Sequence, residues 1–456
     1  MPAHIYLRTG RYQDAVSASV IAIRSDRLYE EKCLVPYVPL HNIAMLVSAS
    51  LFCGNFIQAL KYSPYSSLSL PEASAIHLPA LIPTPKDVIM TRMGRWTDIL
   101  SIFADNSEIK NNSLSTRNPR AIKFIKYTSI NKDKSELFIE RERGKRKSLR
   151  SNTNQIGNEK GMNLDSINRK TFGTSTDSPY VRAMQAYSQT LAYSGTGDLR
   201  RAGNFLDILS ESVKSIPYDN LPLDHPFYPY HHEISEILLL IARSSLILKE
   251  NINRGESLDS SILLMKEAVG LQDSFSYMEP ESFHFPVRHC LGALLIERSK
   301  LEIQEKVTTL QGQGEEQGQR QRQRGGATGA QLDSDTELLV VAGLELESAV
   351  GHTVSLLEAI DVYRTDLEDH PRNIWSLRGL LLAYQSLQQI RLRNTTESVT
   401  QTKEQTMMAV KREEEKDDGE LFVHIATLKA IERDAFASTD HDYMKITGSC
   451  CELSLC

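Results

Sequence analysis

The feature that most constrains the fold is a short phrase that recurs four times along the chain. In each copy, residues at helical spacing lead to a glycine, then a polar residue, then an aromatic or aliphatic one and a small or aliphatic one. Glycine readily adopts the positive φ that ends a helix, so each phrase predicts a helix, a tight turn and a second helix. The copies are centred on Gly10-Arg11-Tyr12, Gly54-Asn55-Phe56, Gly94-Arg95-Trp96 and Gly195-Thr196-Gly197-Asp198-Leu199.

Such helical hairpins cannot bury their apolar faces alone, and they therefore stack on one another. The first three glycines recur about every 40 residues, somewhat more than the ~34 of an ideal tetratricopeptide unit. The excess falls in loops that contain several prolines, as in Pro36-Tyr37-Val38-Pro39. The predicted fold is therefore all-α, a tetratricopeptide-like helical-hairpin solenoid with disordered inserts.

Helical periodicity returns in the second half of the chain. Apolar residues recur at helical spacing, and no alternating strand pattern competes with them. Predicted helices cover Ile234 to Glu250, Leu258 to Leu271, Val287 to Leu301, Glu337 to Asp366 and Ile374 to Ile390.

Composition divides the chain into helical and polar parts. A basic segment rich in Asn, Ser, Lys and Arg and a Gln/Gly/Arg tract have too few apolar residues for a core, so we expect them to be disordered. The predicted parts are tetratricopeptide-like hairpins at 1–100, the disordered basic insert at 101–178, further hairpins at 179–310, the low-complexity loop at 311–335, a helical hairpin at 336–392, a polar linker at 393–420, and a C-terminal helix with a cysteine-containing tail at 421–456.

Charge and cysteine content narrow the partners and the compartment. The net charge of −6 over 456 residues is small, which argues against nucleic acid as the partner of the folded part. No apolar run is long enough to span a membrane, and the N-terminus lacks the apolar stretch of a signal peptide. The six cysteines show no spacing typical of a disulfide framework or a zinc site, so we expect reduced thiols and a cytoplasmic protein.

Searches for catalytic, cofactor and metal motifs find none. The chain has no phosphate-binding loop, no Gly-x-Ser-x-Gly elbow and no His-Glu-x-x-His phrase. Two looser groups could bind a metal, but each has a simpler interpretation. The group His225, His231, His232 and Glu236 is interpreted as a solvated helix start, and Cys450, Cys451 and Cys456 as an exposed tail. We therefore predict no catalytic, cofactor-binding or metal-binding residue.

A set of phrases carries a family resemblance. They run from Met1 to Tyr12, from Pro39 to Asn42, from Arg92 to Trp96, from Tyr277 to Pro280, from Pro286 to Gly292, from Val362 to Leu367 and from Pro371 to Leu380. In this order they resemble a family of tetratricopeptide-repeat proteins, mostly bacterial, of roughly this length. The family pattern has further helices and another histidine before the first motif, whereas this chain begins inside it. This departure predicts an N-terminally truncated form without its capping repeats, and the resemblance implies a fold but no particular activity.

The first candidate contacts open the first helices of two adjacent hairpins. First helices line the concave groove of a tetratricopeptide stack, so polar side chains there are candidate ligand anchors. The alternative is that the histidines cap helices or form hydrogen bonds within the core. The residues are His4, Arg8, His41 and Asn42.

A second candidate group surrounds a proline-framed turn. Arg288 is expected to pair with Glu279 or to grip a ligand carboxylate with two hydrogen bonds. Asn373 and Trp375 open a later helix and are candidates for the same groove, with Tyr277 as the fifth member. The alternative is a buried Arg–Glu pair that pins the loop.

The sequence favours a scaffold or binding module over an enzyme. Its predicted groove would hold a protein, a peptide or a small ligand, without a cofactor. The rival hypothesis is a small-molecule or metal-dependent enzyme that uses His4, His41, Glu279 and Arg288 in a shared pocket.

Overall fold

The computed structural model shows a chain built from α-helices. Every regular element in the described part of the chain is an α-helix, which confirms the all-α prediction. Contacts group the chain into two compact units, Met1–Ile102 with Asn168–Cys456, and Phe103–Ile167; the first unit holds all that follows, apart from the end of one helix. The structure describes residues 2–34, 36, 39–63, 84–112, 178–218, 230–304, 354–398, 423, 425–433, 435 and 450.

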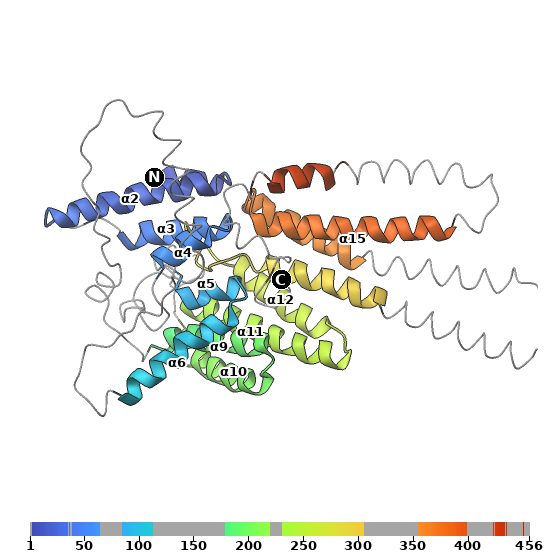
Figure 1. The fold of residues 1–456 in the computed structure, drawn as a ribbon, viewed down its shortest axis with the longest axis horizontal. Helices are drawn as coiled ribbons and strands as arrows, with labels where there is room; N and C mark the ends of the chain where they lie inside the picture. The colour runs from blue at the N-terminus through green and yellow to red at the C-terminus, as the bar shows by residue number, and fades with distance from the viewer. Residues whose placement is uncertain are drawn as a thin grey trace, which may run out of the picture. The chain divides into compact units, whose positions relative to one another are not determined.

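Most helices come in pairs joined by short turns (Figure 1). Helices α9, α10, α11 and α12 lie side by side, and α2 packs on α3. Helices at 288–304 and 354–369 follow, and α15 (Ile374–Ser398) ends the series. The paired helices are α1 (Pro2–Arg8) with α2 (Tyr12–Glu31), α3 (Pro39–Phe52) with α4 (Phe56–Tyr62), α5 (Lys86–Arg92) with α6 (Trp96–Asn112), α9 (Pro179–Thr196) with α10 (Leu199–Lys214), and α11 (His231–Arg254) with α12 (Asp259–Asp273).

The five turns share one hydrogen-bonding pattern. Each has a glycine at positive φ, and the next backbone N–H reaches the carbonyl five residues before it, as a Schellman motif requires. For example, the Arg11 N–H bonds the Tyr6 carbonyl at 2.8 Å. The glycines are Gly10, Gly54, Gly94, Gly197 and Gly255. The four predicted turns are confirmed, and the fifth, at Gly255, was missed because no aromatic residue follows it.

Two apolar cores hold the helices together. The first lies among α9 to α12, the helices at 288–304 and 354–369, and α15. The second lies among α1 to α4 and includes Trp375 at the start of α15, whose indole N–H donates to the Leu51 carbonyl at 3.0 Å. Tyr12 and Phe56, the aromatic residues after two turn glycines, are buried in this second core.

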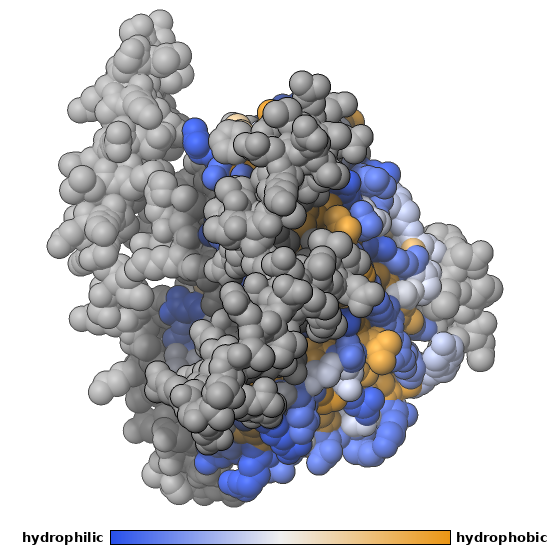
Figure 2. Space-filling model, turned by 90° about the vertical axis from the view of Figure 1, so that its right-hand side faces the viewer, coloured by the Kyte–Doolittle hydropathy of each residue, from blue (hydrophilic) through white to orange (hydrophobic). Residues whose placement is uncertain are grey.

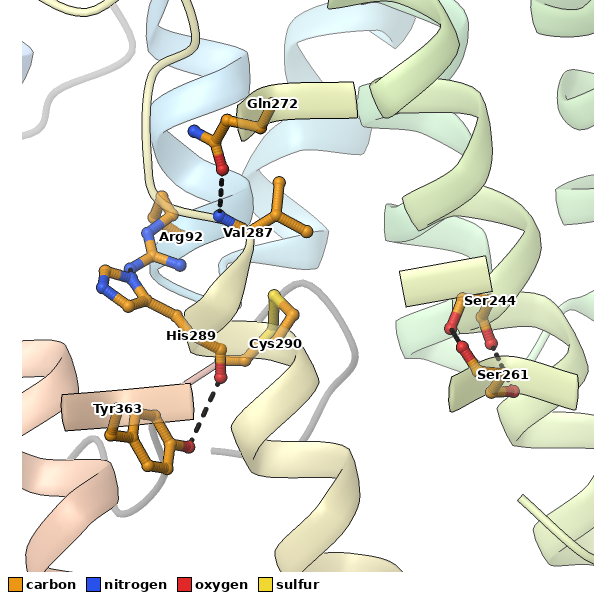
Figure 3. Close-up of a disulfide and its surroundings, with 9 residues drawn as sticks. Arg92, Ser244, Ser261, Gln272, Val287, His289, Cys290 and Tyr363 are labelled. Atoms are coloured by element: carbon orange, nitrogen blue, oxygen red, sulfur yellow. Dashed lines mark hydrogen bonds between the residues drawn. A yellow bond between two sulfur atoms is a disulfide. The ribbon is translucent and has the colours of Figure 1, made fainter. Parts of the chain in front are cut away.

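Close helix packing in the first core depends on two glycines around Tyr363. A Cβ atom at Gly292 or at Gly379 would overlap the Tyr363 ring. The ring is fully buried, and its hydroxyl donates to the His289 carbonyl at 3.4 Å (Figure 3). These two glycines therefore bring the helix at 288–304 and α15 close to the helix at 354–369.

Several predicted boundaries fall differently in the structure. Helix α6 runs to Asn112, so the prediction of an insert that begins at residue 101 is wrong there. Helix α15 continues to Ser398, beyond the predicted end of the helical hairpin at 392. The remainder of the basic insert, residues 113–177, the tract at 311–335 and the linker beyond residue 398 lie outside the described residues.

One disulfide contradicts the predicted cysteine chemistry. Cys290 and Cys450 are bonded, with their Cα atoms 4.9 Å apart, and both side chains are buried (Figure 3). The predictions that all cysteines are reduced and that Cys450 lies in an exposed tail are therefore wrong. A pairing across 160 residues leaves no spacing signal in the sequence. Disulfides persist mainly in oxidising compartments, so the basis for predicting a cytoplasmic protein is also removed.

One face of the described part of the chain shows a mixture of hydrophilic and hydrophobic residues (Figure 2). Figure 2 shows hydrophilic residues over much of the described part of one face, with hydrophobic residues between them. None of the described helices combines the length and the apolar composition that a membrane-spanning segment needs.

Candidate functional site

Two polar clusters meet the segment between α12 and the helix at 288–304. Gln272 of α12 holds this segment in place, because its side-chain oxygen accepts from the Val287 N–H at 2.8 Å and its amide donates to the Phe285 carbonyl at 3.1 Å (Figure 3). Glu279 reaches one cluster and Glu281 the other. The outer cluster is His4, Arg8, His41, Tyr277 and Glu279, and the inner cluster is Arg92, Glu281, His289, Asp366, His370, Asn373 and Ser376.

Asp366 is the centre of the inner cluster. Its carboxylate is buried and accepts four hydrogen bonds, from His289 Nε2 at 3.1 Å, His370 Nδ1 at 2.9 Å, Asn373 Nδ2 at 3.1 Å and the Ser376 hydroxyl at 2.5 Å. Burial raises its pKa, but the histidines and their hydrogen bonds outweigh burial and hold the pKa well below its usual range. Asp366 is therefore an anion held by a full set of donors.

His289 is locked at both ring nitrogens. Arg92 donates to its Nδ1 at 3.0 Å, so the proton of the neutral ring is on Nε2, which faces Asp366. Burial lowers the pKa of His289 to about 4, which keeps the ring neutral. The Arg92 guanidinium packs between Phe285 of the first core, at 4.3 Å from the ring centroid, and Trp375 of the second core, at 3.9 Å. With both nitrogens bonded inside the protein, His289 is not available to act on a ligand.

His370 carries the second positive charge of the inner cluster. Its Nδ1 bonds Asp366 at 2.9 Å, its Nε2 bonds Glu281, and its ring stacks on Phe52 with the centroids 5.1 Å apart. Burial lowers its pKa, but the two carboxylates outweigh burial and raise the pKa to about 11. The positive charges of Arg92 and His370 therefore balance the negative charges of Asp366 and Glu281, and we assign the inner cluster to stability.

These shifts predict a stability maximum near neutral pH. Between about pH 6.5 and 4, His289 is protonated in the unfolded chain but stays neutral in the folded protein. The unfolded state therefore binds more protons, and the stability of the fold falls as the pH decreases. Above about pH 6.5 folded His370 keeps a proton that the unfolded chain loses, so stability also falls as pH rises toward 11. His289 alone should account for about 3 kcal/mol of the acid loss. Melting temperatures from pH 4 to 9 test this, and a steady rise above pH 7 would contradict it.

The outer cluster is partly exposed to solvent, whereas His289 and Asp366 of the inner cluster are buried. His4 Nδ1 donates to a Glu279 carboxylate oxygen at 2.6 Å, and its Nε2 lies 3.3 Å from Nε2 of His41. The other Glu279 oxygen accepts from the Tyr277 hydroxyl and lies 4.0 Å from Arg8 Nε. The Arg8 guanidinium lies over the Tyr277 ring, 4.3 Å from its centroid. Three elements, α1, α3 and the segment between α12 and the helix at 288–304, thus place five polar or aromatic side chains together.

His41 has an incomplete set of hydrogen bonds. Its Nδ1 is buried and has no hydrogen-bond partner in the described part of the chain. Burial, followed by the neighbouring His4, lowers its pKa, so the ring is neutral at physiological pH. A neutral imidazole at this position offers a lone pair to a ligand or a cation.

The structure separates the other predicted site residues from the outer cluster. The expected pair of Arg288 with Glu279 is not formed. Arg288 pairs instead with Asp273, through two hydrogen bonds of 2.6 Å. Asn42 bonds Asp26 at 2.8 Å and ties α3 to α2. Asn373 caps α15, because its side-chain oxygen accepts from the Trp375 N–H at 3.0 Å.

Burial removes two of these residues from any ligand surface. Asn373 and Trp375 are both buried, so they belong to the helix start and the core rather than to a groove. Of the nine predicted contacts, five lie together in the outer cluster: His4, Arg8, His41, Tyr277 and Glu279.

The histidines at the start of α11 do not form a solvated group. His231 is buried and packs edge-on against Tyr180, with the ring centroids 4.5 Å apart, so the prediction of a solvated helix start is wrong for this residue. His232 and Glu236 lie one turn apart, with 4.0 Å between Nδ1 and the carboxylate oxygen. His225 lies outside the described residues.

The inner cluster was not predicted as a unit. Arg92, His289 and Asp366 each occur in phrases of the family resemblance, but nothing in the sequence connects them. One signal was present, because Asp366 and His370 are four residues apart and such residues share a helix face. Across the described ranges, no group of three or more His, Cys, Asp or Glu side chains is placed to hold a metal ion.

The comparisons with known proteins add no family to this description. Set against protein-family models, curated proteins and solved structures, the chain matches none of them. The chemistry of the two clusters is therefore the basis on which function is proposed.

Proposed function

We propose that the protein is a tetratricopeptide-like binding module that holds a protein or peptide partner at its outer cluster. Two features support the repeat architecture. Five helix pairs share the same glycine turn, and helices that follow one another along the chain pack together, as α2 does on α3 and α10 on α11. Stacked hairpins of this kind offer an extended surface to a partner.

The observation that carries the proposal is the exposed, ordered pair of Arg8 and Tyr277. The Arg8 side chain is 56% exposed and Tyr277 is 61% exposed, yet the guanidinium rests on the ring. Ile5, three residues before Arg8 on α1, is 65% exposed. Tyrosine and arginine are among the residues that contribute most binding energy at protein interfaces, and a stacked arginine loses less freedom on binding.

Pull-down with a matched surface control tests the proposal. We expect the double variant Arg8→Ala/Tyr277→Ala to recover a stoichiometric partner at least about tenfold less well than the wild type, because each truncation at such a position costs about 1–2 kcal/mol of binding. The control is Arg201→Ala/Tyr218→Ala, whose side chains are 56% and 65% exposed. Equal partner recovery by the two double variants, at unchanged melting temperature, would contradict the proposal.

An enzyme remains a second candidate because one observation favours it. His4 and Glu279, 2.6 Å apart, form the histidine–carboxylate pair that orients a general base. However, Arg288 lies elsewhere, and the only hydrogen bonds of His4 and His41 to described residues are to Glu279 and to each other. No described hydroxyl or thiol is therefore bonded to either histidine as a nucleophile, and binding is the better supported function.

A further inference from the structure

The two histidines of the outer cluster face each other through the same ring atom. His4 lies on α1 and His41 on α3, and their Nε2 atoms are 3.3 Å apart. The ring centroids are 5.2 Å apart and the ring planes differ by only 26°, so the two rings lie close to parallel. Two imidazole nitrogens converge on one small volume between the helices.

Glu279 determines which nitrogen of His4 has the lone pair. Its carboxylate accepts from Nδ1 at 2.6 Å, so the proton of a neutral His4 is on Nδ1 and the lone pair is on Nε2. A carboxylate on the outer nitrogen of a histidine is the usual second partner of a metal-binding imidazole, where it fixes the tautomer and raises basicity. The His4 lone pair therefore points at His41.

His41 gains from a cation at the same place. Nδ1 of His41 is buried and has no partner in the described part of the chain, so hydrogen bonding at this nitrogen favours neither tautomer. If the proton is on Nδ1, both Nε2 lone pairs face each other. A cation between the two Nε2 atoms converts that repulsion into two bonds.

The spacing matches one coordination geometry. With metal–nitrogen bonds of roughly 2.0–2.1 Å, two ligands of a tetrahedral zinc ion lie roughly 3.3–3.4 Å apart, whereas opposite ligands would lie about 4 Å apart. The observed 3.3 Å between the Nε2 atoms fits the tetrahedral edge. Neutral imidazoles favour zinc and its transition-metal neighbours over magnesium or calcium.

We propose that His4 and His41 bind one divalent transition-metal ion, with Zn²⁺ as the favoured ion, through their Nε2 atoms. Glu279 acts behind His4 as the carboxylate that holds its tautomer. Two protein ligands leave the remaining positions to water or to a donor group of a bound partner, such as a carboxylate or an imidazole. The inference rests on the proposed function, because it concerns the same outer cluster. Metal binding needs no partner, however, so the two proposals can fail separately.

Titration of the full chain with ZnCl₂ and with CoCl₂ tests the proposal. By calorimetry we expect the wild type to bind one zinc ion that His4→Ala and His41→Ala do not bind, and Glu279→Gln to bind it about 10–100-fold more weakly. Cobalt should give the visible absorption bands of a tetrahedral complex in the wild type only. The matched control is His232→Ala, because His232 also lies beside a glutamate, Glu236, and this variant should titrate like the wild type.

Two results would overturn the proposal. One is identical zinc stoichiometry in the wild type, His4→Ala and His41→Ala, and the other is loss of the same site in His232→Ala. If a histidine variant fails to fold, the melting temperature of the wild type with and without Zn²⁺ decides. Zn²⁺ should raise its melting temperature and a chelator should reverse the rise, because an ion that binds only the folded state stabilises it. Absence of any shift would exclude the site, whatever the outcome of the partner pull-down.

Discussion

Asp366→Ala is expected to destabilise the protein by roughly 3–5 kcal/mol, the usual cost of breaking a buried charge network by removing one partner. Asp366 is 1% exposed and accepts four hydrogen bonds. Without it, the protonated His370 keeps only Glu281 as a counter-charge, and the Nε2–H of His289 loses its carboxylate acceptor in the interior. Chemical denaturation at pH 7 measures the loss.

A surface aspartate provides the matched control. Asp273 also accepts hydrogen bonds from a basic side chain, since Arg288 reaches it with two bonds of 2.6 Å, but Asp273 is 43% exposed. Because solvent replaces a partly exposed ion pair, Asp273→Ala should cost no more than about 1 kcal/mol. If Asp366→Ala lost no more stability than Asp273→Ala, the inner cluster would not be the structural centre that its hydrogen bonds indicate.

The parts of the fold that could be predicted are those that local chemistry determines. A glycine turn between helices needs only a few neighbouring residues, and so Gly10, Gly54 and Gly94 were correctly placed at positive φ. The turn at Gly255 has the same geometry without the aromatic residue, which shows that the aromatic is an accessory of the turn and not its cause. The end of α6 was misplaced because its polar composition after residue 101 resembles that of the insert.

The candidate site was predictable only where the repeat pattern itself places residues. His4 and His41 occupy the first helices of adjacent hairpins, and the structure brings them together. Arg288 was assigned to Glu279 because a proline-framed turn lies between them, whereas Asp273, at the end of the preceding helix, is the actual partner. The link between Arg92 and His289 spans 197 residues and depends on packing between two cores, which no local pattern reports.

The turn at Gly10 connects this local chemistry to the inner cluster. Gly10 has a φ of +68°, and a Cβ atom there would overlap the carbonyl oxygen of Pro371. Pro371 directly follows His370, whose ring lies between Asp366 and Glu281. A side chain at Gly10 would therefore overlap backbone next to the residue whose imidazolium bonds both carboxylates.

Gly197 separates this overlap from the cost of the backbone conformation. It has a φ of +86°, and no atom lies within 4 Å of the position that a Cβ atom would take, so Gly197→Ala should cost only the roughly 1 kcal/mol of holding alanine at positive φ. Gly10→Ala has the same strain and adds the overlap with Pro371, for a total of roughly 2–4 kcal/mol. Because the two substitutions are chemically identical, the difference between their unfolding free energies isolates the close approach of the α1–α2 turn to Pro371. Equal losses in the two variants would mean that the segment after the helix at 354–369 yields to the new methyl group, and that the position of His370 does not depend on the first hairpin.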